Sequence, residues 1–152
     1  MTTSYAPGQQ IPVVYQDNYT VQVEGDLTNV DCWVGVAYTQ KFTFSKQYLK
    51  KQGSNVSELE GRLQHKRWKL VHKGTHSYRV EVTPKFRNTY TKEFNGDTVG
   101  NSPVQLSDGE FSFLVPAKND EVEVTVINEG PFAANFIAAE WQADYSSKAR
   151  HV

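Results

Sequence analysis

Residues 110–126 decide the fold, and they read Glu-Phe-Ser-Phe-Leu-Val-Pro-Ala-Lys-Asn-Asp-Glu-Val-Glu-Val-Thr-Val. Apolar residues take every second position in 110–115 and again in 121–126, which is the spacing of a strand with one buried face and one exposed face. The same alternation occurs in 19–24 and 78–83. Similar composition predicts further strands at 32–38, 40–44, 63–72, 87–94 and 136–145.

Turn-forming residues separate these runs, at 73–74, 95–97, 108–109 and 129–131. Asp108-Gly109 is the strongest candidate for a hairpin turn. The apolar positions of 63–72 shift phase, which indicates a β-bulge near Lys66. Only 55–61 has a helical signal, because Ser57 and Glu60 form a capping box.

Short strands with turns between them predict an all-β fold, an antiparallel β-sandwich or jelly-roll-like single domain with at most one short helix. We expect an N-terminal arm at 1–18, the sandwich domain at 19–145 and a C-terminal tail at 146–152.

Composition and net charge narrow the classes of function that the chain can have. The chain has 152 residues, with 16 Lys and Arg against 17 Asp and Glu, so its net charge of −1 argues against a nucleic-acid-binding domain. Residues 1–76 hold 9 basic and 6 acidic side chains, whereas 77–152 hold 7 and 11. This asymmetry is typical of a head-to-tail contact between copies, although evenly solvated faces explain it equally well.

Cysteine usage and the N-terminus indicate where the chain is made. Cys32 is the only cysteine and lies in an apolar run, so we expect a small core residue. The first 12 residues have neither the basic nor the apolar segment of a secretory signal, and no apolar run approaches the roughly 20 residues that span a bilayer. These features predict a soluble protein made in a reducing compartment, without membrane insertion.

Catalytic and metal-binding patterns are weak. No histidine lies beside a nucleophile motif, and His72 and His76 are separated by a turn residue and lack a nearby third ligand. Asp120, Glu121 and Glu123 alternate with valines as on the exposed face of a strand. We therefore predict no catalytic residue, no metal site and no cofactor.

Two features suggest binding. The stretch His65-Lys66-Arg67-Trp68-Lys69 places an indole among cations, which fits either a phosphate clamp or a surface strand with outward cations and an inward tryptophan. Aromatic residues are also abundant, as in a sugar-stacking platform or in a core with subunit contacts. The candidate interface residues are Lys50, Lys51, Arg67, Trp68 and Lys69, and the candidate exposed aromatics are Trp33 and Trp141.

The order of several motifs from Val34 to Val152 resembles the C-terminal part of the tail tubular protein B family, the nozzle component of short-tailed bacteriophages. The motifs are 38–45 (Tyr-Thr-Gln-Lys-Phe-Thr-Phe-Ser), 61–64 (Gly-Arg-Leu-Gln), Arg67-Trp68-x-Leu70, 78–82 (Tyr-Arg-Val-Glu-Val), Gly109-x-Phe111-x-Phe113-x-Val115-Pro116, Trp141-x-x-x-Tyr145 and a final Arg150. Members of that family are much longer, so we expect the chain to correspond to part of their length.

The resemblance implies a structural virion protein of the tail nozzle, arranged in a ring of identical subunits through which DNA is ejected, and carries no catalytic residues to transfer. It implies partners among copies of the chain and neighbouring tail proteins or fibres, DNA passage without sequence-specific binding, and location in the virion after synthesis in the host cytoplasm. Two alternatives stay open, a carbohydrate-binding β-sandwich for receptor recognition and, more remotely, a glycoside-cleaving enzyme with two carboxylates in a cleft.

Overall fold

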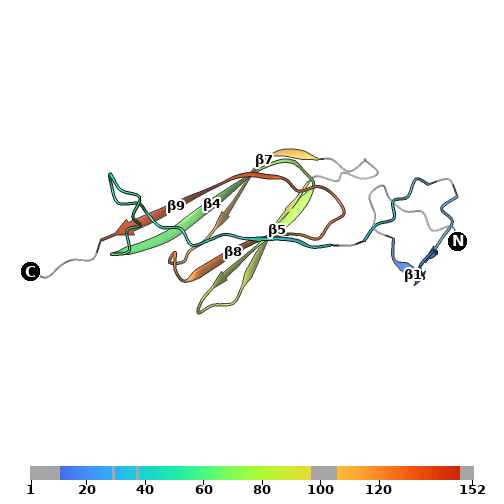
Figure 1. Ribbon diagram of the computed structural model, residues 1–152, viewed down its shortest axis with the longest axis horizontal. Coiled ribbons are helices and arrows are strands. Elements are labelled where there is room, and N and C mark those ends of the chain that lie inside the picture. Colours follow the sequence, from blue (N-terminus) through green and yellow to red (C-terminus); the bar gives the residue numbers. More distant parts are fainter. Residues whose placement is uncertain (1–10, 29, 37, 97–105, 148–152) are drawn as a thin grey trace, which may run out of the picture. The chain divides into compact units, whose positions relative to one another are not determined.

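The computed structural model describes residues 11–28, 30–36, 38–96 and 106–147. Contacts between Cα atoms divide the chain into two compact units, one of residues 1–37 with 97–105 and one of residues 38–96 with 106–152. Within the described residues there are nine strands and no helix, so the expected all-β fold is confirmed (Figure 1).

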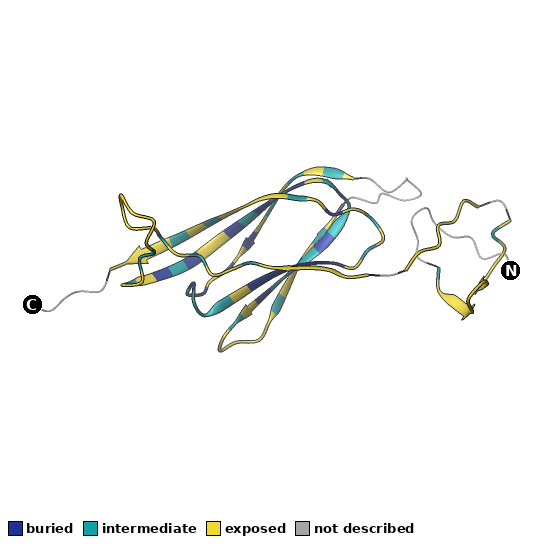
Figure 2. Ribbon diagram, viewed as in Figure 1, coloured by how far each residue is buried: buried dark blue, intermediate teal, exposed yellow. Residues whose placement is uncertain are grey.

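The first unit contains one antiparallel pair of strands. β1 (Val13–Gln16) pairs with β2 (Val21–Val23), and Asp17 holds the turn between them by accepting hydrogen bonds from the backbone N–H groups of Tyr19 and Thr20. Most side chains here are exposed (Figure 2). This strand pair therefore has little core of its own.

The second unit contains two antiparallel sheets. One sheet has the order β3-β8-β5-β6 and the other has the order β7-β4-β9. The strands are β3 (Gln40–Thr43), β4 (Arg62–Thr75), β5 (Ser77–Pro84), β6 (Tyr90–Asn95), β7 (Ser107–Leu114), β8 (Val122–Asn128) and β9 (Phe136–Ser146). Only β5 and β6 are successive strands of one sheet, whereas each step from β6 to β9 crosses to the other sheet.

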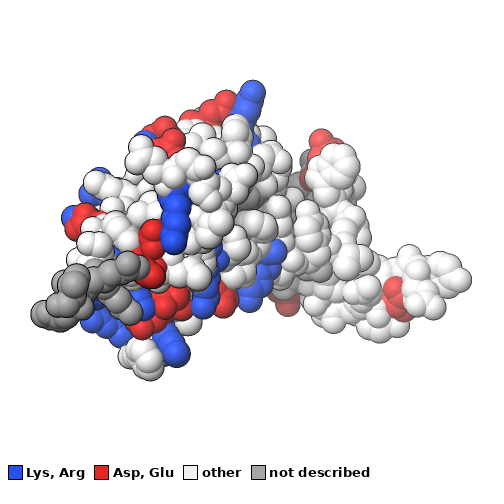
Figure 3. Space-filling view, turned by 60° about the vertical axis from the view of Figure 1, so that its left-hand side comes forward, with Lys and Arg blue, Asp and Glu red and all other residues white. Residues whose placement is uncertain are grey.

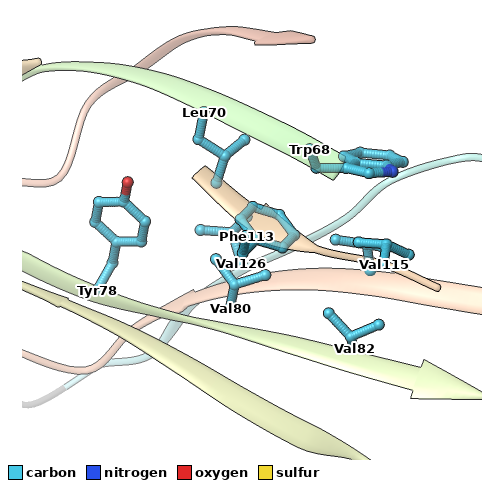
Figure 4. Close-up of a cluster of buried hydrophobic side chains, with 9 residues drawn as sticks. Trp68, Leu70, Tyr78, Val80, Val82, Phe113, Val115 and Val126 are labelled. Atoms are coloured by element: carbon cyan, nitrogen blue, oxygen red, sulfur yellow. The ribbon is translucent and has the colours of Figure 1, made fainter. Parts of the chain in front are cut away.

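The core lies between these two sheets. Trp68 and Leu70 of β4 face Val80 and Val82 of β5, and Phe113 of β7 fills the space between them (Figure 4). The remaining buried members are Tyr78, Val115, Val124 and Val126. Apolar side chains from both sheets thus meet in one layer, as in a β-sandwich.

The alternation in the sequence explains most of these strands. The strands expected at 78–83, 110–115, 121–126, 40–44, 63–72 and 136–145 are all present, and the register of β4 against β9 shifts between His65 and Arg67, where the bulge was expected. β6 begins at Tyr90, three residues after the expected start. The turn at 129–131 is also present, and the Asn128 side chain accepts a hydrogen bond from the Gly130 N–H group.

Five expectations were wrong. One is the turn at Lys73-Gly74, because both residues lie inside β4. Residues 55–61 form bends and an isolated β-bridge between Ser57 and Lys50, without a helix. Asp108-Gly109 lies inside β7, where Gly109 pairs with His72 and a Cβ would meet its ring at 3.6 Å. The described residues of 32–38 form no strand, because no other strand pairs with them. For the same reason Cys32 is exposed and is not a core residue.

Candidate subunit interface

The predicted basic stretch lies on the central strand of the β7-β4-β9 sheet. Because β4 alternates, Trp68 points into the core while Arg67 and Lys69 point outward. Trp68 is only 1% exposed and packs edge-on against Phe44 and His65, with ring centroids 5.2 and 5.5 Å away. Its indole is therefore a core group and is not available to a partner.

Most of the positive charge of this stretch is balanced within the sheet. Lys69 Nζ lies 2.8 Å from a carboxylate oxygen of Glu110 on β7, and this hydrogen bond raises the pKa of the Lys69 ammonium. Lys66 Nζ lies 2.6 Å from a carboxylate oxygen of Asp144 on β9. Figure 3 shows cations and carboxylates interspersed over the face it presents. The stretch is thus a mixed-charge surface rather than a phosphate clamp.

Arg67 differs from Lys66 and Lys69 in that its charge is not paired with any described residue. In the part of the chain that the structure describes, its guanidinium has no ion pair or hydrogen bond with another side chain. It lies at the bulge of β4, opposite Leu114 of β7 and Gln142 of β9. Arg67 therefore remains free to bind a group from outside the chain.

A groove adjoins Arg67, with a volume of about 530 Å³. Its apolar part comes from Leu114, whose residue surface is 57% exposed, and from Pro116. The other lining residues are Gln64, His65, Lys66, Arg67 and Gln142. Arginine is enriched at protein interfaces, and the buried centre of an interface is more apolar than its rim.

Sequence reasoning missed this groove, although it contained one signal. In 110–115 the inward positions are Phe111, Phe113 and Val115, so Leu114 is an apolar residue at an outward position. The acidic partners Glu110 and Asp144 could not be assigned from sequence, because cross-strand pairing depends on register.

The remaining candidate residues lie elsewhere. Lys50 and Lys51 are exposed in the loop between β3 and β4, where the Lys51 N–H group donates to the carbonyl oxygen of Val56. Trp141 of β9 is half-buried against the core. Trp33 belongs to the first unit and is 99% exposed. Of the three tryptophans, only Trp33 offers its full surface to a partner.

Charge is divided differently between the two compact units than between residues 1–76 and 77–152. Residues 1–37 and 97–105 contain five acidic side chains and no basic one, so the first unit has a net charge of −5. All 16 basic residues belong to the second unit, together with the other 12 acidic ones, which gives a net charge of +4. The two units are thus of opposite sign.

The structure offers few features of a catalytic or metal site. Among the described residues there is no group of three or more His, Cys, Asp or Glu side chains placed to hold a metal ion. The same residues include no helix long and apolar enough to cross a membrane.

Comparison with models of known protein families gives a match over nearly the whole chain. The family model described as bacteriophage nozzle protein matches residues 2–152, nearly the whole chain. No curated protein matches the chain.

Proposed function

The chain belongs to the bacteriophage nozzle protein family, and from this membership we propose that it acts as a subunit that binds copies of itself and neighbouring tail proteins in a ring. Its role is structural, as part of the tail nozzle of a phage, and its location is the virion tail. The match over residues 2–152 is the observation that carries this conclusion.

The physical properties of the second unit support a structural role. A sandwich whose core is formed by both sheets is a rigid unit that can be placed beside identical units. Its surface holds a groove with two apolar lining residues, Leu114 and Pro116, and a free guanidinium, whereas Lys66 and Lys69 are paired with carboxylates of the same chain. We propose that the protein is not an enzyme and that it requires no cofactor.

The basic segments have a place in this proposal. We infer that Lys50, Lys51 and Arg67 face an acidic surface of a neighbouring tail subunit or fibre, and that DNA passes without sequence-specific contacts. The overall charge of −1 supports passage of DNA without tight binding, because nucleic-acid-binding domains usually carry a large basic excess. Synthesis in the host cytoplasm is part of the same proposal.

Carbohydrate binding receives no support from the comparisons. It needs exposed aromatic rings grouped on one surface. Trp68 is buried and Trp141 is half-buried, so only Trp33 of the three indoles has the exposure that sugar stacking requires.

The proposal is tested by the mass of the protein in solution. Light scattering after size exclusion is measured for the chain alone and after mixing with neighbouring tail proteins. We expect an oligomer or a mixed complex of defined mass. A chain that remains monomeric over the whole concentration range and joins no other tail protein would contradict the proposed function.

A further inference from the structure

Trp33 is the most exposed large side chain of the described residues. Its relative exposure of 99% compares with 1% for Trp68. Its neighbours Val34 and Val36 are 79% and 93% exposed. A run of large apolar side chains in contact with water marks an interaction site, because their burial releases roughly 25 cal/mol for each Å².

The groove beside Arg67 has the properties needed to receive such a side chain. It has a volume of about 530 Å³ and is open to solvent. Leu114 and Pro116 supply apolar contacts. Arg67 supplies a cation that can lie over the face of an aromatic ring, which is most favourable with tryptophan.

The charges around Trp33 and around the Arg67 groove also favour contact between these two surfaces. Asp31 lies two residues before Trp33, and its carboxylate has no ion pair with any described residue. Arg67 lines the groove and has no ion-pair partner among the described residues, whereas Lys66 beside it is paired with Asp144. The unit that carries Trp33 has a net charge of −5, whereas the unit that carries the groove has +4. Opposite charges around an apolar contact accelerate binding and fix its orientation.

We propose that Trp33 of one copy inserts into the Arg67 groove of a second copy, with Asp31 beside Arg67. This inference rests on the proposed function, because a nozzle is built from associated subunits. Every copy then carries one inserting segment and one receiving groove. Such a contact is heterologous, and repeating it gives a ring if the rotation closes.

The contact is tested with matched variants of the full chain. Trp33→Ala removes the inserting ring, and Tyr19→Ala is the control, because Tyr19 is 98% exposed in the same unit. We expect Trp33→Ala to raise the dissociation constant of self-association by about tenfold or more, as for a central interface tryptophan. Tyr19→Ala is expected to leave it within about twofold of the wild type, as for a peripheral contact. Sedimentation velocity over a dilution series measures both.

Exchanging the charges of Asp31 and Arg67 tests whether these two side chains lie side by side in the contact. Asp31→Arg and Arg67→Asp each place like charges together, so each single variant associates more weakly than the wild type. The double variant carries the reversed pair and recovers most of the association. Recovery in the double variant supports the contact between Asp31 and Arg67, and its absence overturns it.

Mixing two defective chains separates a contact between copies from one within a chain. Leu114→Glu closes the groove with a carboxylate that repels Asp31, while Trp33→Ala leaves the groove intact. Mixed together, the two variants still share one intact contact and form a heterodimer. If both remain monomeric after mixing, while the wild type associates, the contact is not between copies and the inference is wrong.

The outcomes distinguish this inference from the proposed function. Wild-type association that Trp33→Ala does not weaken overturns the inference alone. A wild-type chain that joins other tail proteins but never a second copy also overturns only the inference. A chain that joins nothing contradicts the proposed function itself.

Discussion

The three tryptophans show how environment decides what one residue type does. Trp68 lies at the centre of the core, Trp141 covers its edge with a ring centroid 5.3 Å from that of His65, and Trp33 is in water. Sequence alone assigned Trp68 to the candidate interface because cations flank it. The structure places those cations on the opposite face of β4, which follows from the two-residue period of a strand.

Substituting two of these tryptophans by alanine should therefore have very different effects on stability. We expect Trp68→Ala to lower the free energy of unfolding by about 3–5 kcal/mol, because it leaves a large cavity in the core. Trp33→Ala should change it by less than about 0.5 kcal/mol. Urea denaturation at a concentration where the chain is monomeric measures both, and equal effects would show that the core is not where the structure places it.

His65 is a buried imidazole in an apolar setting. It is 1% exposed, lies between the rings of Trp68 and Trp141, and neither ring nitrogen has a hydrogen-bond partner among the described residues. Burial lowers the pKa of His65 below its ordinary value. The folded chain therefore keeps this side chain neutral where the unfolded chain would protonate it.

This difference in the protonation of His65 predicts that the folded protein loses stability in acid. As the pH falls below about 6.5, the unfolded chain binds a proton at His65 more readily than the folded chain does, so the free energy of unfolding decreases. The pKa of His72 is lowered in the same direction, mainly by burial. We expect His65→Phe to flatten the decrease between pH 7.5 and 5.5, measured by urea denaturation at each pH. Parallel profiles for variant and wild type would contradict this assignment.

At the scale of elements, sequence periodicity predicted the strands that have both a partner and a buried face. β5 alternates over nearly its whole length, β7 and β8 alternate over part of theirs, and each of the three contributes side chains to the core. The bulge of β4 was predictable too, because it moves the apolar phase from Leu63 to Trp68. These signals arise from local geometry and burial, which the sequence records directly.

The errors concern features that depend on distant residues. Residues 32–36 have the composition of a strand, but strand formation also requires a partner, and no described strand of the chain pairs with them. Asp108-Gly109 has the composition of a turn, yet the Asp108 carboxylate accepts a hydrogen bond from the Gly74 N–H group and Gly109 leaves room for His72. Local propensity was overridden by tertiary contacts in both places.

The candidate site was predictable in part for the same reason. The sequence identified Arg67 and Trp33 as binding residues, but it did not show that Lys66 and Lys69 have acidic partners on neighbouring strands. Whether Arg67 and Trp33 form an interface is the prediction tested by the variants above.

Gly61 controls the start of β4. Its φ of +114° is unfavourable for other residues, and a Cβ there would lie 2.7 Å from the carbonyl oxygen of Ser146 at the end of β9. The Tyr145 hydroxyl donates to the carbonyl oxygen of Glu60 beside it. The loop before β4 and the end of β9 thus depend on a residue without a side chain.

We therefore expect Gly61→Ala to destabilise the protein by more than about 2 kcal/mol, from backbone strain and displacement of β9 together. Gly53→Ala is the control, because Gly53 has a φ of +73° but no atom within 4 Å of its Cβ position. It carries only the backbone strain, about 1–2 kcal/mol. Thermal unfolding of both variants measures the difference, and equal melting temperatures would show that the Ser146 contact is unimportant.

At the scale of the whole molecule, the two units divide stability and charge between them. All members of the core cluster belong to the second unit, and so do the partly buried side chains packed against the cluster. The first unit contributes acidic charge and exposed apolar residues. Its removal should therefore leave the core intact and remove one side of the proposed contact.

A chain of residues 38–152 is expected to fold and not to associate with itself. Its free energy of unfolding should lie within about 1 kcal/mol of that of the full chain, because surface regions away from the core contribute little to stability. The shortened chain keeps the groove but lacks Trp33, so it can accept one full-length copy and cannot add another. Titrating it into the full-length protein should therefore lower the average mass, measured by light scattering, as it terminates growing assemblies. If Leu114→Glu in the shortened chain abolishes this effect, the groove is the acceptor. If the shortened chain folds but leaves the mass unchanged at every ratio, Trp33 has another acceptor.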